Sequence, residues 1–179
     1  SLSKKDPRIS VYHKENGGLS EARNFGVLKC KGEYITFLDP DDYLEPYTLE
    51  LMNRLQMKYS ADVVSLRVCG TPSHNDYSGK ITVNENDIEN VLDVNKEEAL
   101  IEMFYDDNAT VSSCGKLFKK SLFDDIKFPK GRIYEDLAIV AKLVDKSNTV
   151  IISRNKAYKY YRREGSIVNS KFTDKRFFK

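Results

Sequence analysis

Residues 33–42 read Glu-Tyr-Ile-Thr-Phe-Leu-Asp-Pro-Asp-Asp, an apolar run that ends in three carboxylates. The run predicts a buried strand over 34–38. An extended backbone points alternate side chains to the same face, so Asp39 and Asp41 can reach one common point. Like charges that close repel each other, and a divalent cation with oxygen ligands relieves the repulsion. The end of this strand is therefore a candidate metal site.

The same residues also fit a purely structural interpretation. Asp39-Pro40 can begin a turn, and Asp42 can cap a following helix, with Glu45 three residues later completing a capping box. At this point both interpretations stay open.

Length and composition suit one globular domain, with 179 residues, 40% of them hydrophobic and 31% charged. No apolar run of about 18 residues exists, and residues 1–5 have no apolar signal core. We therefore expect a cytoplasmic protein, with peripheral contact at the inner face of the membrane as an alternative. The net charge of +2 argues against nucleic-acid binding. Three widely spaced cysteines argue against a disulfide framework or a zinc site.

Hydrophobic periodicity predicts alternating strands and helices over 1–179, taken as a single domain. The expected strands are 9–12, 34–38, 62–69, 111–119 and a late edge strand at 150–152. The expected helices are 19–30, 46–59, one that opens with capping-box spacing at Asn95 and Glu98, and 135–146. The order predicts an α/β fold with a mostly parallel sheet flanked by helices. The polar segment 71–93 is expected to be an insertion or mobile loop.

Two blocks resemble the inverting nucleotide-sugar glycosyltransferases with the GT-A fold. They are residues 16–26, Asn-Gly-Gly-Leu-Ser-Glu-Ala-Arg-Asn-Phe-Gly, and residues 32–44, which contain the Asp-Pro-Asp-Asp stretch. Later blocks are similar to signatures of bacterial members that build capsule, O-antigen or exopolysaccharide: Gly-Lys-Leu-Phe at 115–118, Tyr-Glu-Asp at 134–136, and residues 160–167. The resemblance runs in order over nearly the whole chain.

Two features of that family are missing or altered. Its members begin with a strand carrying a Pro-Val-Tyr-Asn-like segment and a second strand ending in Asp-Asp-Gly-Ser, and neither is in this sequence. The resemblance therefore implies an incomplete GT-A domain that lacks roughly sixty N-terminal residues, inactive alone and prone to self-association through an exposed sheet edge. Cys114 stands where an aromatic residue often lines the acceptor side.

The resemblance also implies roles for acidic residues. Asp39, Asp41 and Asp42 would hold Mg²⁺ or Mn²⁺ at the donor diphosphate. Asp136 would be the general base, and Glu135 its orienting or substrate-binding neighbour. Without the resemblance, Glu135 and Asp136 fit an ordinary helix start, where acids favour the macrodipole.

The basic residues have similar pairs of interpretations. Arg23 would contact the nucleotide, together with Asp39, or else face solvent. Lys116 would form the floor of the acceptor pocket, or be a surface cation. Arg162, Arg163 and Ser166 would fold over the donor diphosphate, or belong to a solvated basic tail; these three lie in the segment 154–179.

The sequence thus predicts transfer of a sugar, with inversion, from a nucleotide-diphosphate donor to a saccharide or lipid-linked acceptor in bacterial surface polysaccharide synthesis. A UDP-sugar is the expected donor. Two other functions stay open: a non-catalytic fragment that packs against a missing N-terminal half or a partner, and a nucleotidyltransferase with similar carboxylate-metal chemistry.

Overall fold

The computed structural model describes residues 2–73, 77–105, 109–132 and 134–162. The helices are α1 (Gly18–Lys29), α2 (Thr48–Tyr59), α3 (Glu85–Glu89), α4 (Lys96–Tyr105) and α5 (Glu135–Lys146), with short 3-10 turns η1 (Leu2–Lys4) and η2 (Lys120–Phe123). The strands are β1 (Tyr34–Thr36), β2 (Tyr43–Leu44), β3 (Val63–Thr71), β4 (Val91–Leu92), β5 (Lys116–Lys119) and β6 (Val150–Tyr161). The expected α/β class is confirmed.

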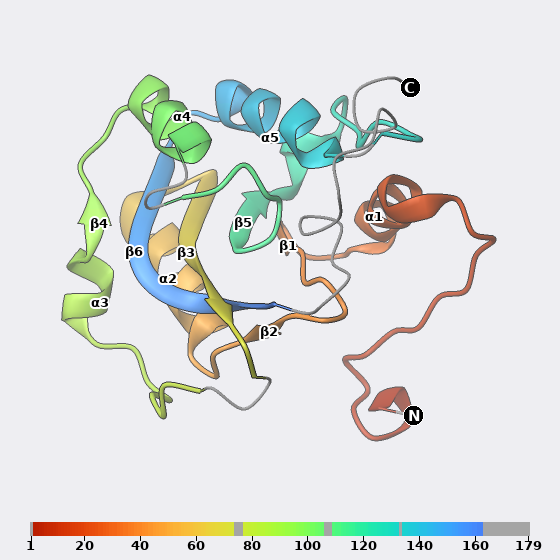
Figure 1. Ribbon diagram of the computed structural model, residues 1–179, viewed down its shortest axis with the longest axis horizontal. Helices are drawn as coiled ribbons and strands as arrows, with labels where there is room; N and C mark the ends of the chain where they lie inside the picture. The colour runs from red at the N-terminus through yellow and green to blue at the C-terminus, as the bar shows by residue number, and fades with distance from the viewer. Residues whose placement is uncertain (1, 74–76, 106–108, 133, 163–179) are drawn as a thin grey trace.

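One curled sheet organises the fold, with strand order β1-β5-β3-β6-β2 and β4 added against β6. The long strands β3 and β6 pair in parallel from Val63 opposite Val150 to Thr71 opposite Tyr161. Their register shifts between Leu66 and Val68, and Figure 1 shows β6 curving past β3. The far ends of these two strands are thereby brought beside the loop that follows β1.

The strand directions correct the expectation of a mostly parallel sheet. β5 pairs antiparallel with both β1 and β3, and β2 and β4 pair antiparallel with β6. Among the described strands, only β3 and β6 form a parallel ladder. β1, β3 and β6 do run the same way, as the strand-helix order predicts, but β5 is inserted between the first two. Local periodicity carries no information about such an insertion.

Two further expectations about strands were wrong. Residues 9–12 form no strand and are exposed, because nothing in the described chain pairs with them. The strand expected at 150–152 lies inside the sheet and continues to Tyr161. Exposed Arg154 and Lys156 interrupt its apolar run. Asn155 between them and Ala157 after them are buried, so the strand continues to face the core.

Helix capping explains where two helices begin. The expected capping box of α4 is present: the Asn95 side chain accepts hydrogen bonds from the amides of Glu97 and Glu98, and the Glu98 carboxylate accepts one from the Asn95 amide at 2.8 Å. A second capping box, between Asn84 and Asp87, opens α3 inside the segment 71–93. This segment, expected as an insertion or mobile loop, therefore contains a helix too short for periodicity to detect.

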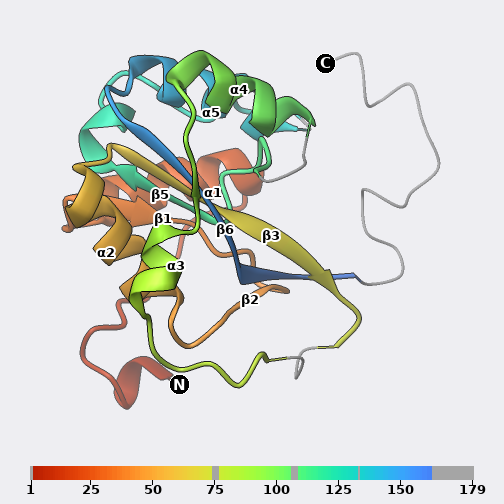
Figure 2. The same ribbon diagram turned by 90° about the vertical axis from the view of Figure 1, so that its left-hand side faces the viewer.

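The core has two parts, one on each face of the sheet. The part beneath α4 and α5 includes Met103, Phe118 and Leu143. The other lies between α2 and β3 and includes Leu51 and Leu66. Figure 2 shows the helix pairs α4/α5 and α2/α3 on opposite sides of the strands. Burying each such side chain contributes about 1.5–3 kcal/mol, so both faces hold the sheet in place.

None of the helices in the described ranges is both long enough and apolar enough to cross a bilayer.

Glu45 is a buried charge that links three segments. Its side chain has 0% exposure and lies 3.3 Å from the Lys159 ammonium of β6. Its carboxylate also accepts hydrogen bonds from the amide of Ser78 at 3.0 Å and from the Ser78 hydroxyl at 3.1 Å. Glu45 is thus not part of a capping box with Asp42. Helix α2 begins later, after Tyr47, which makes no side-chain cap.

We expect Glu45→Ala to lower the free energy of unfolding by about 3–5 kcal/mol, because it breaks a buried ion pair and leaves the Ser78 donors without their acceptor. The control is Glu50→Ala on α2, whose carboxylate is 52% exposed beside Arg54. This control should cost less than about 1 kcal/mol. Urea unfolding followed by circular dichroism measures both. Equal losses in the two variants would contradict the assigned role of Glu45.

Candidate active site

Arg23 lies at the centre of the site, with its side chain only 6% exposed. It projects from α1, and its Nη1 donates hydrogen bonds of 2.7 Å to both Glu135 Oε1 and Asp136 Oδ1. Its Nη2 donates to Asp39 Oδ1 at 3.0 Å. One guanidinium therefore joins α1, the acidic loop after β1 and the first turn of α5.

The surroundings of Arg23 favour a fixed cation. Burial lowers the pKa of Arg23, but the charges of Asp136 and Asp39 outweigh it, so the pKa lies above its usual value. The guanidinium also lies over two rings, 5.9 Å from the centre of Phe37 and 5.3 Å from that of Phe128. A planar guanidinium can bind several carboxylates and contact rings at the same time, which an ammonium does less well.

The acid pair at the start of α5 follows a strained residue. Tyr134 has φ 61° and ψ 42°, the left-handed region, which costs a non-glycine residue about 1–2 kcal/mol. Burial is the main reason that the pKa of Glu135 is raised, and the nearby charge of Asp136 adds to it. The second oxygen of Asp136, Oδ2, lies 3.4 Å from the Ser112 hydroxyl. Both acids are thus held toward Arg23.

Tyr158 of β6 fixes the acidic loop from the other side. Its buried hydroxyl donates to Asp42 Oδ2 at 2.6 Å and accepts a hydrogen bond from the Asp39 amide at 3.3 Å. Asp42 Oδ1 accepts a further bond from the Tyr161 amide at 3.0 Å. Burial raises the pKa of Asp42 and also that of Tyr158. Sequence reasoning missed Tyr158, because this residue lies beyond the strand expected at 150–152, among the basic residues of the segment 154–179.

The predicted metal ligands Asp39, Asp41 and Asp42 lie in the acidic loop after β1, and their role stays a prediction. Within the described ranges, no three or more His, Cys, Asp or Glu side chains are arranged to hold a metal ion. Each oxygen of Asp42 accepts one hydrogen bond from β6, so the direction of this carboxylate is fixed by the sheet. Asp39 accepts a hydrogen bond from Arg23 through Oδ1. Asp41 is two residues further along the same loop. Two carboxylates do fit Mg²⁺ or Mn²⁺ when phosphate and water oxygens complete the shell.

A cavity of about 430 Å³ opens beside these groups. The carboxylates that line it are Asp39, Asp42, Glu135 and Asp136. Cys114 lines it too; burial raises the pKa of this thiol to about 11, so it stays neutral at physiological pH. The structure thus brings together, around one cavity, acids that are about a hundred residues apart in the sequence. An apolar cleft with converging polar groups is the usual form of a ligand site.

The basic residues lie differently from what was expected. Lys116 is fully buried and donates a hydrogen bond to the carbonyl of Thr110, a residue of the cavity wall. Having no exposed surface, it supports the wall rather than forming the floor of a pocket. The Arg162 guanidinium lies directly over Gly70, where any Cβ would collide with it. The predicted residues Arg163 and Ser166 lie outside the described residues.

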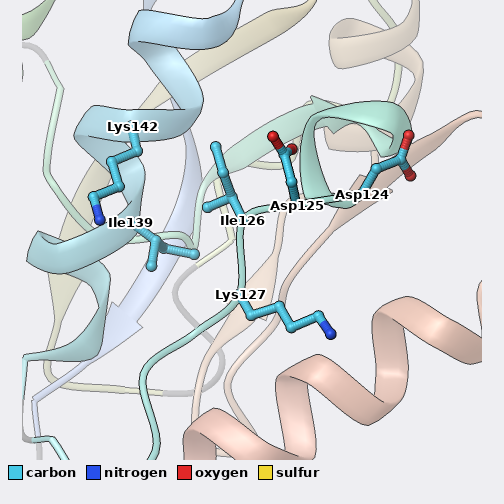
Figure 3. A pocket seen from close by; sticks show the side chains of 6 residues that line it. All are labelled: Asp124, Asp125, Ile126, Lys127, Ile139 and Lys142. Atoms are coloured by element: carbon cyan, nitrogen blue, oxygen red, sulfur yellow. The ribbon is translucent and has the colours of Figure 1, made fainter.

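A second hollow, of about 460 Å³, lies between the loop before residue 128 and α5. Figure 3 shows that its charged groups point in different directions and do not converge. It is lined by Asp124, Asp125, Ile126, Lys127, Ile139 and Lys142. Asp125 is paired with Lys146. This hollow has no feature of a catalytic site.

The pattern of Glycosyl transferase family 2 matches residues 1–127. The chain belongs to this family. It is 32% identical over 174 residues to glycosyltransferase GlyA of Streptococcus pneumoniae serotype 4, covering 93% of this chain and 24% of that protein. It is 29% identical over 169 residues to the minor teichoic acid biosynthesis protein GgaB of Bacillus subtilis, covering 90% of this chain and 17% of that protein.

Among solved structures, the crystal structure of S. aureus TarS 1-349 in complex with UDP-GlcNAc superimposes with a TM-score of 0.68. The sequence identity is 23%, over 92% of this chain and 44% of that one. This likeness confirms the expected GT-A fold. The chain spans less than half the length of GlyA, GgaB and the TarS structure.

The raised pKa of Glu135 predicts a pH dependence. A carboxyl whose folded pKa lies above its unfolded value of 4.5 stabilises the fold below that value, and the contribution is lost as the pH rises through the folded pKa. Glu135→Gln removes this loss. We therefore compare the Tm of the variant with that of the wild type. We expect the difference, variant minus wild type, to be larger at about pH 7.5 than at about pH 4, by about 2–4 °C for each kcal/mol.

Thermal unfolding at the two pH values measures the difference. Glu97→Gln, on an exposed position of α4, is the control and should leave the difference unchanged. If the Tm of Glu135→Gln instead falls relative to that of the wild type as the pH rises, the ion pair with Arg23 outweighs the cost of burial and the account of Glu135 is wrong.

Proposed function

We propose that the protein transfers a sugar, with inversion, from a nucleotide-diphosphate donor to a hydroxyl of a saccharide or lipid-linked acceptor. The observation that carries the proposal is the arrangement around Arg23, which holds a pair of carboxylates at a cavity beside an acidic loop. Membership of Glycosyl transferase family 2 and the similarity to GlyA and GgaB support it. The similarity to a minor teichoic acid biosynthesis protein, GgaB, supports a place in surface polysaccharide synthesis.

Asp136 is the general base in this proposal. Inversion requires a base on the face of the sugar opposite the leaving diphosphate, where it takes the proton of the attacking hydroxyl. The Asp136 side chain is 18% exposed and that of Glu135 is 11% exposed, so Asp136 is more accessible from the cavity. Its Oδ1 is held by Arg23, which leaves Oδ2, near the Ser112 hydroxyl, to accept the proton.

Glu135 and Arg23 position this base. Glu135 shares Nη1 of Arg23 with Asp136, which fixes the direction of both side chains. Because the donors of Arg23 are directed at carboxylates, the structure supports a positioning role for it. The expected contact of Arg23 with the nucleotide stays a prediction, as do the diphosphate roles of Arg162, Arg163 and Ser166.

Asp41, together with Asp39 or Asp42, would hold the divalent cation. Mg²⁺ or Mn²⁺ at this place would neutralise the diphosphate of the donor and so make it a better leaving group. A UDP-sugar is the proposed donor, and the UDP-GlcNAc bound to TarS, a protein of the same fold, supports that choice. Self-association through an exposed sheet edge, a cytoplasmic location and peripheral contact with the inner face of the membrane stay predictions.

The base assignment predicts a specific kinetic effect. In the full-length protein incubated with UDP-GlcNAc, Mn²⁺ and a panel of glycoside acceptors, Asp136→Asn should lower kcat by about 10²–10⁴ and largely spare donor affinity. The amide keeps the shape of the side chain but does not accept a proton at neutral pH. Glu135→Gln should cost less. Released UDP, measured with a coupled assay, reports turnover, and chelation by EDTA should stop it.

The alternatives give different results in the same assay. Release of pyrophosphate in place of UDP would indicate a nucleotidyltransferase, and no turnover by the whole protein with any donor would indicate a non-catalytic unit. A wild-type rate in Asp136→Asn together with an inactive Glu135→Gln would reverse the roles of the two acids. The control Asp145→Asn, at the far end of α5, should leave the rate unchanged.

A further inference from the structure

Tyr134 is a bulky residue at a position where local rules favour another type. It occupies the N-cap of α5 with φ 61°, yet its side chain makes no capping hydrogen bond. N-caps favour Ser, Thr, Asp, Asn or Gly, and glycine is the residue that adopts a positive φ without strain. Ser60, the other described non-glycine residue with positive φ, is at the C-cap of α2, where this conformation is common. Helix geometry therefore does not explain the tyrosine.

The side chain of Tyr134 lines the cavity that holds the acid pair. Three of the residues that line it are apolar or aromatic and still largely exposed: Tyr134 at 42%, Leu137 at 45% and Leu19 at 47%. Tyr160 also lines this cavity. Exposed large apolar side chains that gather at a cavity indicate a surface that a ligand covers.

The charges of the cavity indicate which kind of ligand fits. Within the described part of the chain, its lining contains carboxylates but neither lysine nor arginine. A phosphate group would meet repulsion there unless a cation lay between, as proposed at Asp39. A neutral ring with many hydroxyls meets none, because its hydroxyls donate hydrogen bonds to carboxylates while its C–H face packs on an aromatic ring. The chemistry of the cavity is therefore that of a saccharide site.

We propose that Tyr134 binds the acceptor saccharide, with its ring packed on the C–H face of the sugar whose hydroxyl gives its proton to Asp136. The proposal rests on the proposed function. Tyr134 is two residues before Asp136, and both line the same cavity, so one sugar can contact the ring and the carboxylate together. The strained backbone is retained because glycine, which would relieve it, has no ring.

The test uses two substitutions that separate the ring from the backbone. Tyr134→Gly removes the ring and relieves the strain, so saccharide affinity should fall about 3- to 10-fold while Tm stays equal or rises by about 2–4 °C. Tyr134→Phe keeps the ring, and its affinity should stay within about twofold of the wild type. Saturation-transfer difference NMR with methyl β-D-glucopyranoside measures binding, and glycerol is the control polyol without a ring face.

Unchanged glucoside affinity in Tyr134→Gly would overturn the proposal. If the Tm of this variant were also lower, the ring would have a structural role. Release of UDP from UDP-GlcNAc with water as acceptor is measured in parallel. If the wild type releases UDP while Tyr134→Gly binds the glucoside normally, the inference fails and the proposed function stands. If no UDP is released but Tyr134→Gly loses glucoside binding, the saccharide site stands and the transfer reaction fails.

Discussion

The guanidinium of Arg23 faces three carboxylates in a place nearly closed to water. Asp39, Glu135 and Asp136 belong to segments that no backbone ladder joins directly, and each would repel the other two without the cation between them. Removing one member of a buried ion pair costs about 3–5 kcal/mol, because the remaining charge is left without compensation. The position of the acidic loop relative to α5 therefore depends on this one side chain.

A second anchor, Tyr158, makes the arrangement specific. Its hydroxyl holds Asp42 and the Asp39 amide against β6, so the acidic loop is fixed from two sides. Asp42 is thereby held by contacts with β6, while Asp39 gives one carboxylate oxygen to Arg23. Acids that look equivalent in the sequence therefore have different contacts in the structure. These differences arise because the partners lie on elements that are distant in the sequence.

The sequence predicted those parts of the fold that are encoded locally. Helix α5 is amphipathic and begins at two acids, and α4 begins at a capping box, so both were expected where they occur. The direction of β5 and the central position of β6 depend on which strands pair. Short apolar runs in the sequence do not predict strand pairing. Likewise, Glu135, Asp136 and Arg23 were found through family resemblance, whereas the burial of Arg23 and Lys116 and the contacts of Tyr158 required the tertiary structure.

The most direct test of the central role of Arg23 is a double-mutant cycle with Arg23→Met and Asp39→Asn, measured by urea unfolding. If the guanidinium holds the acidic loop to the acid pair, the two substitutions act on one interaction, and their effects on the free energy of unfolding should differ from additivity by about 1–3 kcal/mol. Additivity within about 0.5 kcal/mol would show that Arg23 and Asp39 are energetically independent, which contradicts the account.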